Sequence, residues 1–156
     1  MVKVDTSAAS RSGLWSVLGA LCRYGLAGIW LYSGFIKMLD PLGFRQSVQA
    51  YELFPPAIEG FIAQVLPPTE FALGLLLLLG LFLRPTALVT GVIMLGFMAG
   101  ISSAWARGLE IDCGCFSTDH AADSTTHVTA LIRDLLFLIM AWWVWKRPFT
   151  RWALHP

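Results

Sequence analysis

The sequence predicts an all-α integral membrane protein: a four-transmembrane-helix bundle with a short periplasmic interfacial helix after the first span, in a single domain over residues 1–156. Apolar residues make up 56% of the chain and charged residues 13%, too little polar surface to cover a water-soluble core. Four segments also reach the roughly 20 mostly apolar residues that cross a bilayer. The spans are expected at about 14–36, 58–83, 86–106 and 128–145. Membrane lipid is therefore an expected partner, whereas a net charge of +1 gives no basis for binding nucleic acid.

The first span follows a polar start and is expected to serve also as the insertion signal. Residues 14–39 are too long for the apolar part of a cleavable signal peptide, and no small-residue cleavage site follows them. In the next loop, apolar side chains spaced around Arg45 and Gln49 predict a short interfacial helix that ends at Pro55-Pro56. These apolar side chains are Phe44, Val48, Tyr51 and Leu53.

The second and third spans are expected to form a tight antiparallel hairpin, because only Arg84-Pro85 separates them. The second span contains Pro67-Pro68, which lack backbone donors and predict a kink. In the third span, Gly96 and Gly100 have a spacing that suits close contact between helices.

The loop charges predict the orientation, because cytoplasmic loops are rich in Lys and Arg. Six of these residues fall on one side of the predicted spans: Lys3, Arg11, Arg84, Lys146, Arg147 and Arg151. Three fall on the other: Lys37, Arg45 and Arg107. Both termini are therefore expected in the cytoplasm of a bacterial inner membrane, and the loop over residues 107–127 in the periplasm, where disulfides persist.

The most distinctive motif in that loop is Cys113-Gly114-Cys115. A disulfide across so small a ring is strained, and strain makes it a better exchange partner than a structural link. Two alternatives stay open: the cysteines are inert or pair elsewhere, or they bind a metal together with His120 or His127. Cys22, about eight residues into the first span, is expected to be a small buried apolar residue.

Charged residues within the predicted spans are costly and mark candidate functional positions. Glu70 and Arg23 lie near the middle of their spans, so we expect them to form an ion pair that either fixes helix register or serves function. Arg133 and Asp134 lie about one turn into the fourth span from the outer face, near Lys37. A rim of Lys37 and Arg133 would favour the thiolate forms of the cysteines. Alternatively, Lys37 only extends its amine to the interface.

Several short pieces, in fixed order from about residue 21 to 145, resemble the methylamine-utilisation MauE family within the DoxX-like group of four-span membrane proteins. The pieces are Arg23-Tyr24-Gly25-Leu26-Ala27-Gly28, Ser33-Gly34-Phe35-Ile36-Lys37, Leu66-Pro67-Pro68-Thr69-Glu70 with Gly74 and Gly80, Cys113-Gly114-Cys115-Phe116, and Arg133-Asp134. Ser117 departs from the glycine usual after the cysteine motif.

The resemblance implies a redox-associated bundle, analogous to DsbB and vitamin K epoxide reductase, with Cys113 and Cys115 as its catalytic pair. Lys37, Glu70 and Arg133 match recurrent charged positions of the family. The implied partner is a periplasmic thioredoxin-like or disulfide-rich protein. No cofactor is assigned, and a quinone stays an unsupported alternative because the chain lacks a second cysteine pair.

Two functions follow as hypotheses. The first is thiol–disulfide exchange that supports disulfide formation or maturation of a periplasmic partner through Cys113 and Cys115. The second is a non-enzymatic membrane subunit or anchor of a larger complex, with a cysteine loop that is vestigial or binds a metal.

Overall fold

A computed structural model describes residues 6–109 and 124–147 of the chain. Within these ranges the protein is all-helical, without strands, which confirms the predicted class. The helices are α1 (Thr6–Leu39), α2 (Pro41–Ala50), α3 (Pro56–Leu79), α4 (Leu83–Ala106) and α5 (Ser124–Lys146).

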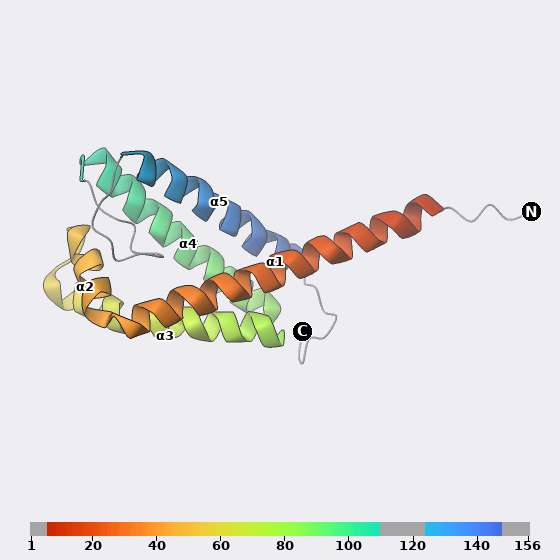
Figure 1. Ribbon diagram of the computed structural model, residues 1–156, viewed down its shortest axis with the longest axis horizontal. Coiled ribbons are helices and arrows are strands. Elements are labelled where there is room, and N and C mark those ends of the chain that lie inside the picture. The colour runs from red at the N-terminus through yellow and green to blue at the C-terminus, as the bar shows by residue number, and fades with distance from the viewer. Residues whose placement is uncertain (1–5, 110–123, 148–156) are drawn as a thin grey trace, which may run out of the picture.

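The long helices form two antiparallel pairs, α1 with α3 and α4 with α5, and the pairs pack side by side (Figure 1). The end of α1, the start of α3, the end of α4 and the start of α5 lie at one end of the bundle, together with α2 (Figure 1). We call this the α2 end. At the opposite end, a core that includes Cys22, Leu26, Leu77, Leu83 and Val144 joins the two pairs.

Two glycines allow α1 and α3 to approach closely. A Cβ atom at Gly34 would lie 2.7 Å from the backbone nitrogen of Phe71 and 2.8 Å from the carbonyl oxygen of Pro67. A Cβ atom at Gly74 would lie 2.8 Å from the backbone nitrogen of Leu31. Neither site can hold a larger residue without moving a helix, so these glycines fix the spacing of the pair.

The connection between α3 and α4 begins four residues and ends three residues before the predicted one. Gly80 ends α3 in the left-handed conformation, with φ 72°, and α4 begins at Leu83. Arg84-Pro85 therefore belongs to the first turn of α4, where proline costs no helical hydrogen bond. The apolar run through residues 81–83 concealed this boundary, which depends on the conformational freedom of Gly80.

Three of the described helices are long and apolar enough to cross a membrane: α3, α4 and the His127–Lys146 part of α5. The chain is thus a multi-pass membrane protein by helix length and composition. Large apolar side chains cover its outer faces, as contact with lipid requires: Phe61 is 66% exposed, Val92 62% and Ile132 56%. α1 is long but contains Arg23 and Lys37 and does not meet the same criterion, so the fourth span stays a prediction.

The short helix expected after the first span is present as α2. It begins at Asp40, whose carboxylate accepts a hydrogen bond from the backbone N–H of Gly43 at 2.9 Å. Phe44 turns inward against the bundle, whereas Leu42 is 73% exposed. This two-sided character is typical of a helix at a membrane surface. Its location in the periplasm stays a prediction.

Candidate functional site

The predicted catalytic residues Cys113 and Cys115, like His120, lie outside the described residues. The helices that flank them are described: α4 ends and α5 begins at the α2 end (Figure 1). Arg107, just after α4, donates hydrogen bonds from its guanidinium to the carbonyl oxygens of Tyr51 and Glu52, just after α2. The chain therefore leaves α4 in contact with the end of α2.

Near this end, Lys37 of α1 and Glu70 of α3 form a buried ion pair. The Lys37 ammonium donates to both carboxylate oxygens of Glu70, at 2.7 and 2.9 Å. The Ser33 hydroxyl donates to the same carboxylate at 2.9 Å. The side chains of Lys37 and Glu70 are 4% and 0% exposed. Such a pair persists only where its geometry is good, as it is here, and the Ser33 hydroxyl supplies a further hydrogen bond to the carboxylate.

The expected ion pair between Arg23 and Glu70 is wrong. Arg23 donates from Nε to the carbonyl oxygen of Leu77 at 2.8 Å and from Nη2 to that of Leu78 at 3.0 Å. These carbonyls belong to the last turn of α3, about 10 Å along the helix from Glu70 at 1.5 Å per residue. The last carbonyls of a helix lack intrahelical donors and carry partial negative charge, so they attract a cation. Arg23 therefore caps α3.

The position of the Lys37 side chain also differs from the two that the sequence suggested. Lys37 is neither part of an exposed cationic rim nor extended to the interface, because its amine turns into the bundle toward Glu70. The antiparallel register of α1 and α3 brings the two groups to the same level. The predicted burial of Glu70 is confirmed, with Lys37 as its partner.

Arg133 and Asp134 are neighbours on α5 and pair with each other. Arg133 donates to Oδ1 of Asp134 from Nε at 3.1 Å and from Nη2 at 2.9 Å. Asp134 is 2% exposed, and its Oδ2 atom has no hydrogen-bond partner among the described residues. Ser33, Arg133 and Asp134 line one small cavity, so the polar groups of α1 and α5 meet inside the bundle.

His127, in the first turns of α5, is buried at 5% exposure. Within the part of the chain that is described, neither of its ring nitrogens has a hydrogen-bond partner. Buried polar groups usually have partners, so this histidine is an exception that calls for a ligand or a neighbour. The described ranges contain no group of three residues suited to hold a metal ion.

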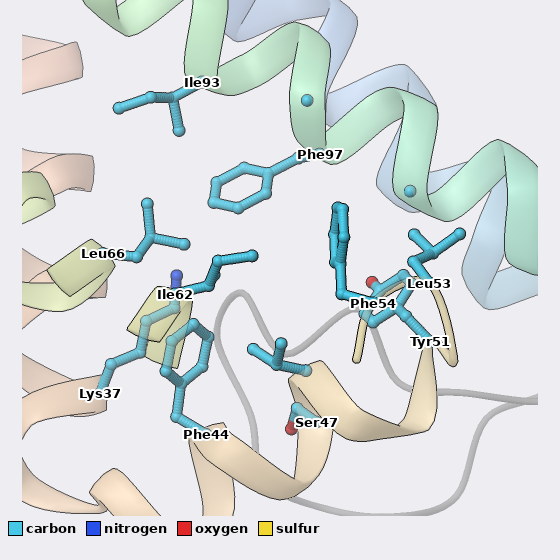
Figure 2. A pocket seen from close by; sticks show the side chains of 13 residues that line it. Lys37, Phe44, Ser47, Tyr51, Leu53, Phe54, Ile62, Leu66, Ile93 and Phe97 are labelled. Carbon is cyan, nitrogen blue, oxygen red and sulfur yellow. The ribbon is translucent and has the colours of Figure 1, made fainter. Parts of the chain in front are cut away.

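A cavity of about 310 Å³ opens among α1, α2, α3 and α4, beside the ion pair (Figure 2). The Lys37 amine reaches its wall between two aromatic rings, 4.9 Å from the centroid of Phe44 and 5.1 Å from that of Phe97. Sequence reasoning missed this cavity, because its walls come from four segments that only the fold brings together. The spacing of Ser33 and Lys37, which places both on one face of a helix, was a signal for the site that binds Glu70, not for the cavity.

The family model described as "Methylamine utilisation protein MauE" matches residues 15–147 of the chain. This range includes all of α2, α3, α4 and α5 and most of α1. No curated protein and no solved structure matches the chain.

Proposed function

The chain belongs to the MauE family of membrane proteins implicated in methylamine utilisation, and on that premise we propose that it exchanges thiols and disulfides with a periplasmic partner. The observation that carries the proposal is the Cys113-Gly114-Cys115 motif in the segment between α4 and α5. The partner is a thioredoxin-like carrier or a disulfide-rich protein that matures in the periplasm. Four crossings, with α1 as the first, and cytoplasmic termini complete the proposed topology.

The exchange balances without another oxidant. A thiolate of the partner attacks one sulfur of the Cys113–Cys115 disulfide, which breaks that bond and forms a mixed disulfide. The second partner thiolate then attacks the mixed disulfide, so the partner becomes oxidised and the Cys113–Cys115 pair leaves as a dithiol. Two electrons and two protons pass from one pair to the other, and the reverse direction uses the same steps.

The position of Cys22 supports an exchange unit of two cysteines. Cys22 is buried in the core at the end of the bundle opposite α2. Arg107, which leads into the cysteine segment, contacts the residues after α2. Cys22 therefore lies apart from the described residues that flank the cysteine segment, so we expect it to take no part in the exchange.

The alternative is a non-enzymatic membrane subunit whose cysteine segment binds a metal. One observation favours it: His127, with no hydrogen-bond partner for its ring in the described ranges, lies three residues into α5, at the α2 end. An imidazole together with thiolates suits a soft cation such as copper(I).

Trapping of the mixed disulfide tests the proposal. Cys113→Ser and Cys115→Ser should each abolish oxidation of the partner, because neither variant can form the disulfide. In the reverse direction, the variant that keeps the attacking cysteine should accumulate a covalent complex with the oxidised partner, because its own resolving thiol is missing. Cys22→Ser is the matched control and should keep wild-type activity. Full activity in the Cys113→Ser/Cys115→Ser double variant would refute thiol exchange.

Labelling tests the topology separately. On intact, reduced spheroplasts, a maleimide that cannot cross the membrane should label the wild type and should not label the Cys113→Ser/Cys115→Ser variant. Labelling that needs lysis would place the motif in the cytoplasm and contradict the proposed periplasmic partner.

A further inference from the structure

The cavity beside Lys37 has the features of a ligand site, and we propose that it binds a neutral lipophilic molecule whose head presents a hydrogen-bond-accepting carbonyl oxygen to the Lys37 amine. A membrane quinone and a neutral glyceride ester share this chemistry. The proposal goes beyond thiol exchange and does not depend on Cys113 or Cys115.

The cavity walls are almost entirely apolar. Its lining includes Phe44, Leu66, Ile93 and Phe97, and Figure 2 shows these side chains around a common space. The Ser47 hydroxyl also lines it but donates to the carbonyl oxygen of Gly43 at 3.1 Å. A volume of about 310 Å³ suffices for a small head group and the start of its tail. Water gains little in such a space, whereas an apolar ligand gains contacts.

Lys37 gives the cavity one oriented donor. An ammonium has three protons, and two acceptors, both on Glu70, are within hydrogen-bond distance of its nitrogen. The amine also lies over the faces of Phe44 and Phe97. The third proton therefore has no oxygen acceptor among the described residues, although a buried N–H group normally has one. A carbonyl oxygen in the cavity would supply it.

The charges beside the cavity favour a neutral ligand. The positive charge of Lys37 is already compensated by Glu70 at 2.7 Å. A carboxylate or phosphate head would approach a neutral pair and would be repelled by the Glu70 carboxylate, without a second cation lining the cavity to offset its desolvation. A neutral carbonyl oxygen can accept the hydrogen bond from Lys37 without the desolvation cost of a charged group.

The mouth of the cavity adjoins apolar surface. Leu53 and Phe54 line it and are 40% and 48% exposed. In a membrane protein, apolar side chains on the outer face contact lipid. A lipophilic ligand can therefore enter from the bilayer, and a long tail can remain in it.

Gly96 provides a way to close the cavity without disturbing the fold. It lies on the cavity wall, and a Cβ atom there would meet no atom within 4 Å. Gly96→Leu therefore fills empty space with apolar atoms, and leucine is a better helix former than glycine. Gly28, on α1, has the same open surroundings but does not line the cavity, so Gly28→Leu is the matched control.

The test measures thermal unfolding of the purified protein in detergent by circular dichroism, with decylubiquinone, dioctanoylglycerol, dodecanoate or dodecane added. A ligand of the folded state raises the melting temperature with its concentration. We expect a rise with at least one of the two carbonyl probes in the wild type and in Gly28→Leu. Gly96→Leu should weaken the apparent affinity by about tenfold or more.

Each outcome decides the proposal. A rise with decylubiquinone alone identifies a quinone, and a rise with dioctanoylglycerol alone identifies a lipid ester. An equal rise in Gly96→Leu, a larger rise with dodecanoate, an equal rise with dodecane, or no rise at all would overturn the proposal.

A second variant tests the role of the amine. Lys37→Met/Glu70→Met replaces both charges by apolar side chains, which buried ion pairs often tolerate. This variant should lose the preference for carbonyl probes over dodecane while the melting transition remains cooperative. An unchanged preference would overturn the role of Lys37; if the variant does not fold, the comparison of Gly96→Leu with Gly28→Leu still decides whether the cavity is the site.

Discussion

The two helix pairs of the bundle handle buried polar groups in different ways. Between α1 and α3, three buried charged side chains have partners: Lys37 binds Glu70, and Arg23 caps the last turn of α3. Within the described ranges, most buried polar atoms without a hydrogen-bond partner lie on α4 and α5, on Thr90, His127, Asp134 and Trp143, and one lies on α1, at the indole nitrogen of Trp30. Close backbone contact at two glycines accompanies the first arrangement only.

The difference indicates a division of labour. Matched charges and close contact make the α1–α3 pair a rigid frame, because each group would be costly to leave alone. Buried polar atoms on α4 and α5 that have no hydrogen-bond partner would only destabilise the fold if they served no other purpose. We infer that the second pair leaves these atoms available to a ligand or a partner.

The largest effect is expected where the rigid frame loses one member of its ion pair. Glu70→Gln or Lys37→Met should each lower the free energy of unfolding by about 3–5 kcal/mol, because the remaining group is buried without its partner. The double variant should lose less than the sum of the two. Unfolding in mixed micelles measures these losses, with the exposed Arg84→Gln as a control expected to change little. Additive losses would show that the pair is not coupled.

A smaller loss is expected at the other end of the same frame. Arg23→Gln should cost about 1.5–3 kcal/mol, since it removes charged donors from the last carbonyls of α3. Because the carbonyls that Arg23 binds lie about 10 Å along α3 from Glu70, the two losses should add within about 0.5 kcal/mol in a double variant. A coupling energy between the two substitutions well above that value would instead support the Arg23–Glu70 ion pair expected from the sequence.

The sequence alone predicted the helices more successfully than their contacts. Apolar runs separated by short polar segments determine which residues form long helices, and α1, α3, α4 and α5 follow them. Boundaries depend on single residues: Gly80 ends α3 although apolar residues continue beyond it. Hydropathy does not register such a turn, which depends on backbone conformation.

The partner of Glu70 could not be identified from the sequence for a different reason. Arg23 and Lys37 are both cations on α1, and choosing between them requires the register of α1 against α3. That register follows from the close contacts at Gly34 and Gly74. The candidate catalytic pair Cys113 and Cys115 still depends on its motif, since it lies outside the described residues.

A third variant tests the close contact of the frame. Gly34→Ala should lower the free energy of unfolding by about 1–3 kcal/mol, because its Cβ would meet the backbone of α3 rather than a flexible side chain. Gly28→Ala, in open surroundings on the same helix, should instead raise it by up to about 1 kcal/mol. Equal effects at the two glycines, measured by the same unfolding assay, would contradict the idea that α1 and α3 are held rigidly.

The smallest effects are expected for two threonines of α4, and their signs test the comparison most directly. The Thr90 hydroxyl is buried without a partner among the described residues, so Thr90→Val should raise the free energy of unfolding by up to about 1 kcal/mol. The Thr86 hydroxyl donates to the carbonyl oxygen of Leu81 at 3.3 Å, so Thr86→Val should lower it by about 1 kcal/mol. Valine matches the shape of threonine at both sites, which leaves the hydroxyl as the difference. A loss at Thr90 would mean that its hydroxyl has found an acceptor, and that the α4–α5 pair is as well matched as the frame.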